Sequence, residues 1–548
     1  MNRRRFLRWS IFSGLVAEPT FSAKFPGRFF PAAASRPRAF ELEEITIQDL
    51  QAGLASGRFT AQQLARLYLE RIEAIDRRGP AVNSVIEINP DALAIARSMD
   101  QERKAKGPRG PLHGVPILIK DNIATHDRMS TTAGSLALIG SIPPRDAFVV
   151  ERLRAAGAVL LGKANLSEWA NFRSNHSSSG WSGRGGQTRN PYVLDRNPCG
   201  SSSGSGVAVS ANLCAVAVGT ETDGSIVCPS SVNGIVGIKP TLGLVSRSGI
   251  VPIAHSQDTA GPMARSVADA AVLLSAMIGP DPRDPITQKS GDRAPQDYTQ
   301  FLQADGLRGA RIGVARRLFG SNPHVQKLMD RALEELKKLG AVLVDPADVA
   351  TSNQLGAHEF EVLLYEFKAD LNAYLAGLGP DAPVRSLKEL IEFNNRHADQ
   401  ELRYFGQELF LKAEEKGPLT EQKYIDARDA ARRLAGPEGI DAALEKHQVD
   451  ALVAPTEGPA CPIDWINGDH FNGGSSTPPA VAGYPSISLP MGFAFGLPVG
   501  ISFFGRAFSE GLLIKFAYAF EQATKFRRTP QFKPTLEIPP QSTTSHEK

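Results

Sequence analysis

Apolar residues recur along this chain in two different patterns. Short runs of β-branched and aliphatic residues alternate with longer segments in which apolar residues return every three or four positions. The first pattern is typical of buried strands and the second of amphipathic helices. The runs that predict strands are Val115–Ile119, Ala158–Leu161, Ala310–Val314, Ala341–Val344, Ala451–Val453 and Ser486–Leu489. Because these strands alternate with helices, the pattern predicts an α/β fold built on a layered sheet.

Polar residues mark where several helices begin. Thr46 and Thr60 each stand directly before a helical pattern, where a hydroxyl can accept hydrogen bonds from free backbone N–H groups. Asn322 occupies the same position ahead of an amphipathic segment that ends near Gly340 and leads into a strand. Further helices are predicted over Phe360–Leu375 and Glu421–Leu434.

The composition is that of a globular protein. The chain has 548 residues, of which 42% are apolar and 22% are charged. Its 61 basic residues nearly balance 58 acidic ones, so it lacks the broad positive charge that binds nucleic acid. Beyond the N-terminus no stretch reaches the roughly 18 to 20 apolar residues that a spanning helix needs. The sequence therefore predicts no nucleic-acid partner and no stable membrane insertion, and it makes no prediction of oligomeric state.

The N-terminus carries an export pattern. Arg3–Arg8 reads Arg-Arg-Arg-Phe-Leu-Arg, which resembles the twin-arginine signal R-R-x-F-L-K. A short apolar run follows, and Ala32–Ala34 offers a small-residue cleavage site. Residues 1–40 are therefore predicted to be an export leader with its linker, and the protein to be periplasmic. If the segment is only a basic tail, the protein stays in the cytoplasm.

The four cysteines are scattered along the chain. Cys199, Cys214, Cys228 and Cys461 show no C-x-x-C spacing, which argues against a zinc ribbon or a dithiol redox site. We expect free thiols or packing residues.

The most unusual composition lies between residues 197 and 240. Two runs rich in small residues, Gly200–Gly206 and Gly219–Ser225, occur there, and their glycines let consecutive N–H groups converge on an anion. A Gly/Ser-rich loop can also be a solvated linker. The strongly apolar segment Val207–Val218 between the two runs argues against a linker. Both loops are therefore expected to emerge from the core and to present candidate nucleophilic hydroxyls.

Two other segments resemble known motifs in their residues but lack a feature that each motif requires. Gly200–Gly204 fits G-x-S-x-G, but that motif needs a preceding strand, which Arg196–Cys199 does not provide. Gly157–Ala164 approaches a phosphate-binding loop, but it lacks the closing Ser or Thr and its apolar middle predicts a strand. Neither an α/β-hydrolase nor a phosphate site is therefore expected.

Three segments stand in an informative order: the lysine segment His113–Asn122 and the serine segments Gly200–Gly204 and Thr222–Ser225. In order and spacing, these segments together resemble the amidase signature family. Further similar segments are Gly162–Glu168, Gly237–Thr241, Asp258–Pro262, Gly483–Pro490 and Gly496–Gly500.

The resemblance implies a fold and a branch of the family. The expected fold is α/β, with a large mixed central sheet covered on both faces by helices. A single amidase domain is implied over residues 41–540, with a more helical segment, an insertion or lid, around 281–445. The segments Ala170–Arg173, Gly185–Pro191 and Gly219–Ser225 look most like the bacterial peptide amidase branch.

The resemblance also implies a Ser-Ser-Lys triad. Ser225 would attack the amide carbonyl, and Ser201, which the family holds through an unusual cis peptide bond, would relay a proton between Ser225 and Lys120. Lys120 must be neutral to accept that proton, although a free lysine has a pKa of about 10.4. Burial after the apolar run Val115–Ile119 would lower this pKa, whereas pairing with Asp121 would raise it.

Oxyanion donors and substrate contacts are implied in the same way. The oxyanion would be held by backbone N–H groups of Thr222, Asp223, Gly224 and Ser225. Asp223 stands where much of the family has glycine, and Val227 where it has arginine. The negative charge of Asp223 would hurt an oxyanion unless the side chain points away. Substrate contacts are expected from Asn171, Phe172 and Arg173.

The predicted function is hydrolysis of a carboxylic amide, either a peptide C-terminal amide or a small carboxamide, with release of ammonia or an amine. No cofactor and no metal are implied. His113, His176 and His255 show no Ser-His-Asp pattern and are expected to be loop or packing residues. The alternative function is a glutamine-hydrolysing subunit of a tRNA-dependent amidotransferase. A binding protein on a decayed scaffold is disfavoured by the intact triad.

Overall fold

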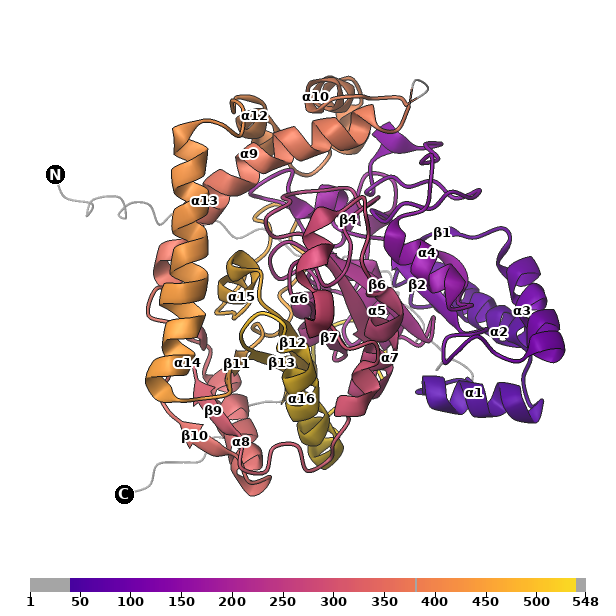
Figure 1. The fold of residues 1–548 in the computed structure, drawn as a ribbon. Helices are drawn as coiled ribbons and strands as arrows, with labels where there is room; N and C mark the ends of the chain where they lie inside the picture. The colour runs from indigo at the N-terminus through magenta and orange to yellow at the C-terminus, as the bar shows by residue number, and fades with distance from the viewer. Residues whose placement is uncertain (1–39, 380–381, 539–548) are drawn as a thin grey trace, which may run out of the picture. The chain divides into compact units, whose positions relative to one another are not determined.

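An 11-stranded mixed sheet forms the centre of the structure, a computed structural model that describes residues 40–379 and 382–538 (Figure 1). Its strand order is β1-β3-β2-β6-β8-β7-β12-β13-β11-β9-β10. The strands are β1 (Val85–Ile88), β2 (Pro116–Lys120), β3 (Val159–Ala164), β6 (Val216–Glu221), β7 (Val236–Lys239), β8 (Thr259–Ala264), β9 (Arg311–Val314), β10 (Val342–Val344), β11 (Ala451–Pro455), β12 (Ser486–Ala494) and β13 (Leu497–Phe504). A separate small ladder joins β4 (Trp181–Ser182) to β5 (Gly186–Gln187).

Parallel and antiparallel pairs occur in different parts of this sheet. β2 runs parallel to β3 and β6, and β9 runs parallel to β10 and β11. The neighbouring pairs between β6 and β11 are antiparallel, and so is the pair of β1 with β3. Because β2 and β6 are parallel neighbours, their C-terminal ends lie at the same edge, which is where the candidate site forms.

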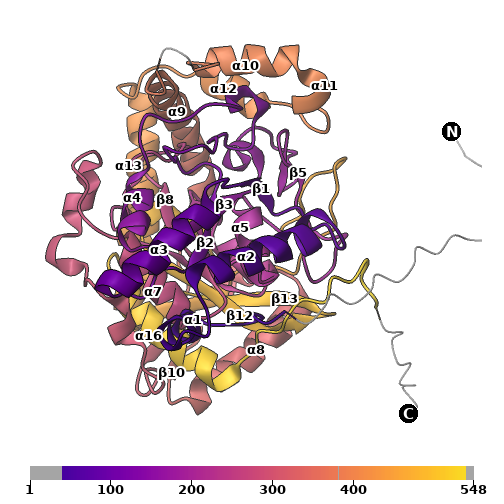
Figure 2. The ribbon, with the colours of Figure 1, turned by 90° about the vertical axis from the view of Figure 1, so that its right-hand side faces the viewer.

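Helices cover both faces of the sheet. α6 and α16 both pack on β12 and β13 without packing on each other, which places them on opposite faces. α2 and α3 cross β2 and β3, as Figure 2 shows. The helices are α1 (Ile47–Ser56), α2 (Ala61–Arg71), α3 (Ala92–Lys106), α4 (Phe148–Ala155), α5 (Ser203–Ser210), α6 (Val227–Val232), α7 (Val267–Met277), α8 (Pro323–Lys338), α9 (Leu355–Ala376), α10 (Leu387–Arg396), α11 (Ala398–Glu401), α12 (Glu408–Glu414), α13 (Gln422–Ala435), α14 (Ala442–His447), α15 (Thr477–Ala482) and α16 (Glu510–Thr524). The α/β fold expected from the sequence is confirmed.

The predicted elements are all present, with ends displaced by a few residues. Each of the six predicted strands corresponds to one of β2, β3, β9, β10, β11 and β12. Thr46 and Thr60 form capping boxes at α1 and α2, and the Asn322 side chain accepts the His324 N–H at 2.9 Å to cap α8. Local side-chain chemistry therefore sets where these helices begin.

Residues 281–445 contain the helices α8 to α13. α9 packs against α12, α13 and α15, and these helices lie together in Figure 1. The same stretch also contributes β9 and β10 to the sheet. The described residues from Phe40 onward form one compact unit, to which this stretch belongs.

The predicted leader, residues 1–40, lies outside the described residues apart from Phe40. Of the helices that the structure describes, none combines the length and the apolar character needed to cross a membrane.

Candidate active site

Three segments distant in sequence meet at the C-terminal ends of β2 and β6. Lys120 is the last residue of β2, Ser201 lies in the loop before α5, and Ser225 lies in the turn between β6 and α6. All three are buried. Ser201 and Ser225 line one cavity of about 380 Å³, and Lys120 lies behind Ser201.

Lys120 has hydroxyl and carbonyl partners. Its Nζ lies 2.8 Å from Ser201 Oγ, 2.8 Å from Thr220 Oγ1 and 3.3 Å from the Thr220 carbonyl oxygen. Asp121, the alternative partner, turns elsewhere and accepts hydrogen bonds from the Thr132 hydroxyl and the Gly134 N–H. The pKa of Lys120 is lowered to about 7 by burial, against the opposing influence of the Asp258 and Glu221 carboxylates. A substantial fraction of this amine is therefore neutral at pH 7.

The two serines lie on adjoining loops. The peptide bond between Gly200 and Ser201 is cis, as the resemblance implies. The Ser202 N–H donates to the Ser225 carbonyl at 3.2 Å, which joins the two loops directly. Among the described residues, no group forms a hydrogen bond with the Ser225 hydroxyl, which leaves it available to a molecule in the cavity.

A buried carboxylate shapes the turn that carries Ser225. Glu221 accepts the N–H groups of Gly224 at 2.9 Å, Ile226 at 2.7 Å and Val227 at 3.0 Å. The prediction that the Gly224 N–H is an oxyanion donor is therefore wrong, because Glu221 already occupies it. The N–H groups of Asp223 and Ser225 donate to no protein group in the described chain. Thr222 also lines the cavity, and its hydroxyl donates to Asp258 at 2.6 Å.

Asp223 is held through its side chain at the cavity wall. Its Oδ2 accepts the Thr477 hydroxyl at 2.7 Å, at the start of α15. Burial raises the pKa of Asp223, and burial together with the Asp223 charge raises the pKa of the neighbouring Glu359 well above its usual value. The side chain of Asp223 is thus held by Thr477 of α15 and lies beside Glu359 of α9.

The predicted substrate-contact segment divides into two parts. Asn171 and Phe172 line the cavity, on a segment in which Trp169, Ala170 and Asn171 all have positive φ. Arg173 does not reach the cavity. Its side chain is fully buried and donates to Glu168 at 2.7 Å, so the prediction that it contacts substrate is wrong. The carboxyl groups of Glu168 and Glu401 lie 2.7 Å and 3.6 Å from its guanidinium group.

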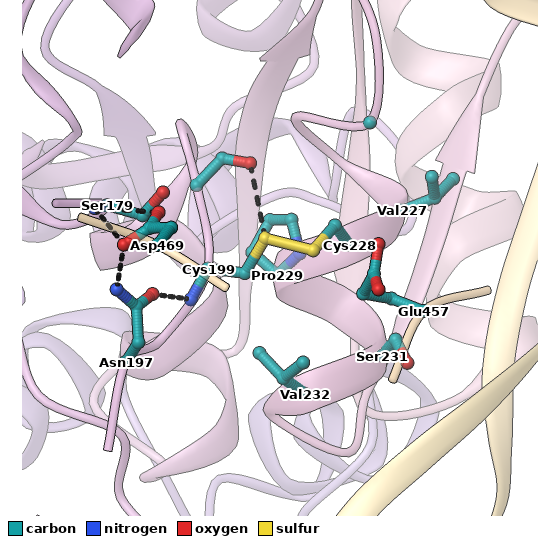
Figure 3. The surroundings of a disulfide bond; sticks show 12 residues. Ser179, Asn197, Cys199, Val227, Cys228, Pro229, Ser231, Val232, Glu457 and Asp469 are labelled. Carbon is teal, nitrogen blue, oxygen red and sulfur yellow. Dashed lines mark hydrogen bonds between the residues drawn. A yellow bond between two sulfur atoms is a disulfide. The ribbon is translucent and has the colours of Figure 1, made fainter. Parts of the chain in front are cut away.

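A disulfide links the two serine loops. Cys199, two residues before Ser201, is bonded to Cys228, three residues after Ser225 (Figure 3). Both cysteines line the cavity. The expectation of unpaired cysteines is therefore wrong for this pair, although Cys214 and Cys461 are free. Their separation of 29 residues follows no short motif, and only the fold brings them together.

A second cavity of about 360 Å³ adjoins the first and shares Ala170, Thr222 and Ile253 with it. His255, at its wall, lies within reach of Asp370 and Glu366, and the three could in principle surround a metal ion. Their oxygen atoms are already engaged, since Glu366 accepts the Tyr424 hydroxyl and Ser256 N–H, and Asp370 accepts His255. The cluster therefore ties the loop after residue 252 to α9.

Three residues of the site were missed by sequence reasoning. Thr220 and Glu221 stand inside the Gly219–Ser225 run, so their position next to the candidate nucleophile was a usable signal. Glu457, which lines the cavity from the loop after β11, stands in no recognisable motif.

The chain is similar to known proteins in sequence. The family model described as Amidase matches residues 63–514. A protein of Arabidopsis thaliana named as a probable amidase is 44% identical, over 90% of this chain and 92% of its own length. A glutamyl-tRNA(Gln) amidotransferase subunit from Chloroflexus aurantiacus is 38% identical, over 89% of this chain and 98% of its own length.

The similarity extends to solved structures. The crystal structure of native peptide amidase from Stenotrophomonas maltophilia superposes with a TM-score of 0.86 at 55% identity, covering 90% of this chain and all of that one. An amidase family protein from Bacillus anthracis gives a TM-score of 0.82 at 38% identity, covering 89% of this chain and 93% of that one. Fold and sequence together define an amide hydrolase. The chain belongs to the amidase signature family.

Proposed function

We propose that the chain hydrolyses the C-terminal carboxamide of peptides through Ser225, Ser201 and Lys120, giving a carboxylate and ammonia. The observation that carries this proposal is the 2.8 Å contact between the Lys120 amine, whose pKa burial lowers to about 7, and the Ser201 hydroxyl beside Ser225. Similarity to peptide amidase, which has been crystallised with the competitive inhibitor chymostatin, supports the peptide substrate.

The hydrogen-bond partners of Lys120 suit both the neutral and the protonated form of its amine. A neutral amine has two N–H donors and one lone pair. The donors can serve the Thr220 hydroxyl and carbonyl, and the lone pair can accept the Ser201 hydroxyl proton. After protonation the third N–H donates to Ser201, which keeps every group satisfied. Proton transfer in this cluster therefore needs no change of partners.

The reaction proceeds in two halves. Ser225 Oγ attacks the carbonyl carbon while its proton passes to Ser201 and the Ser201 proton passes to Lys120. The backbone N–H groups of Asp223 and Ser225 stabilise the oxyanion. The relay then returns a proton to the nitrogen, the C–N bond breaks and ammonia leaves. Water, deprotonated through the same relay, attacks the acyl-serine ester and releases the carboxylate.

Ammonia release from a panel of peptide amides, small carboxamides and glutamine tests this proposal. Wild type is expected to act best on a peptide amide, and Ser225→Ala to lower kcat by at least about 10⁴-fold, because the nucleophile is lost. Ser98→Ala, on the surface of α3, is the matched control and should retain wild-type activity. Retention of activity by Ser225→Ala would refute the assignment.

The glutamine-hydrolysing function is favoured by similarity to amidotransferase subunits. Free glutamine carries an α-carboxylate, and no basic residue of the described chain lines the cavity that holds Ser201 and Ser225, whereas Arg247, Arg283 and His255 line the adjoining one. Strict dependence of ammonia release on glutamine would establish this second function in place of the first.

We further propose that the protein is exported to the periplasm. The twin-arginine pattern Arg3–Arg8 supports this, and so does the Cys199–Cys228 disulfide, since such bonds persist mainly in oxidising compartments. Fractionation of cells that express wild type or an Arg3→Lys, Arg4→Lys variant is the test. Retention of wild type in the cytoplasm would contradict export.

A further inference from the structure

The cavity beside Ser225 has acidic walls and no basic one. Asp223 and Glu457 line it, whereas no lysine, arginine or histidine of the described chain does. Lys120 lies behind Ser201 with 0% of its surface exposed, so its amine does not reach the cavity wall. The basic residues Arg247, Arg283 and His255 line the adjoining cavity instead, so the ionisable side chains at the walls of the cavity beside Ser225 are carboxyl groups.

Glu457 offers a carboxylate oxygen that no protein group uses. Its Oε1 accepts the Gly458 N–H at 2.8 Å and the Asn472 N–H at 3.4 Å, while Oε2 accepts from no group among the described residues. Gly474 keeps the space beside Oε2 open, because a Cβ there would lie 3.0 Å from this oxygen. Burial raises the pKa of Glu457 to about 7, so its carboxylate form predominates in mildly alkaline solution.

The other walls of the cavity are apolar or carry side-chain oxygen atoms. Phe172, Leu363 and the exposed Phe471 provide apolar surface. Asn171 also lines the cavity, and its side-chain oxygen, itself buried, has no hydrogen-bond partner among the described residues. An acyl group with an aliphatic stem and a cationic head would cover the apolar walls and place its donors against oxygen atoms.

We propose that Glu457 is a specificity-determining residue that selects peptide amides bearing a positively charged side chain, arginyl or lysyl, in the acyl part. This inference rests on the proposed function and names its substrate class. The same charge disfavours acidic acyl groups. It also repels the carboxylate product, which helps to clear the site after each turnover.

The test compares two substrates of nearly equal shape at pH 8.5, N-acetyl-argininamide and its neutral isostere N-acetyl-citrullinamide, by formation of the free acid. Wild type is expected to show a kcat/KM about tenfold higher for the arginine substrate. Glu457→Gln should bring the ratio within about twofold of one, whereas Glu457→Asp, which keeps the charge, should retain part of the preference. Glu392→Gln, an exposed charge-matched control on α10, should keep the wild-type ratio.

A wild-type ratio near one overturns the inference, and this result does not depend on whether any variant folds. A full preference in Glu457→Gln overturns it as well. Hydrolysis of the neutral amide with a ratio of one leaves the proposed function standing and refutes only the role of Glu457. Failure to hydrolyse any amide refutes the proposed function itself.

Discussion

Lys120 and Lys239 are the same side chain in similarly dry surroundings, yet only Lys120 is placed to act on a substrate. Both are 0% exposed, and burial lowers their pKa values to about 7 and about 8 respectively. Among the described residues, the Lys239 amine forms a hydrogen bond only with the Pro240 carbonyl, at 3.3 Å, and it lies near the carboxyl groups of Glu221 and Glu510. Lys120 contacts Ser201, whose loop lines the cavity.

Lys163 is a third buried lysine whose pKa is lowered but which has no access to the cavity beside Ser225. Burial lowers its pKa to about 8, and its Nζ lies 2.9 Å from the Thr131 hydroxyl. Thr131 lines neither of the two cavities around Ser225. A lowered pKa therefore does not by itself identify a general base, and a hydroxyl that carries the proton to the cavity is the distinguishing feature.

The largest effect is expected when the two lysines are exchanged for methionine. Lys120→Met should lower kcat by about 10³-fold or more, because the base is lost. It should leave the melting temperature unchanged or higher, because a costly buried amine is removed. Lys239→Met should lower the free energy of unfolding by about 1 to 3 kcal/mol, because the buried Pro240 carbonyl loses its donor and a cation is removed from near Glu221 and Glu510.

Ammonia release and thermal unfolding, measured on both variants, separate these outcomes. The comparison fails if Lys120→Met keeps activity, or if Lys239→Met abolishes kcat with an unchanged melting temperature.

An intermediate effect is expected at Thr220, which holds the Lys120 amine at 2.8 Å. Thr220→Val removes one hydrogen-bond partner of Lys120 and of Asn122, a loss of about 1 to 2 kcal/mol, and should lower kcat about 5- to 30-fold with little change in KM. Thr220→Ser keeps the hydroxyl and should stay within about threefold of wild type. Equal losses in both variants would show that the methyl group, and not the hydroxyl, matters.

The smallest effect on catalysis is expected from the disulfide. Cys199→Ser with Cys228→Ser should lower the free energy of unfolding by about 3 kcal/mol, because the unfolded chain loses a cross-link. It should lower kcat only a few-fold, because hydrogen bonds also join the two serine loops. Cys461→Ser is the control for thiol loss. An unchanged melting temperature in the double variant would contradict a structural role for this bond.

The elements and the main site segments could be predicted because their signals are local. The strands follow from short apolar runs, and Lys120, Ser201 and Ser225 stand in compact motifs whose order is informative. The structure brings these three residues together.

Long-range partners could not be predicted in the same way. Arg173 is occupied by Glu168 and by the Glu401 carbonyl, and the latter is 228 positions away. Cys199 is bonded to Cys228, and Glu457 lines the cavity although it lies more than 200 positions after Ser225. No sequence motif marks either of these partners. The partner of a buried charged side chain depends on how distant segments pack together. No single segment of the sequence contains that information.

The pH dependence of Ser225 labelling by a fluorophosphonate, followed by intact mass and peptide mapping, tests the central claim most directly. The neutral form of Lys120 activates the serine, so the labelling rate should rise as pH increases through about 7 and then level off. Lys120→Met should label slowly at every pH. The account is contradicted if Ser225 takes up no label, or if its labelling rate is the same from pH 6 to pH 9.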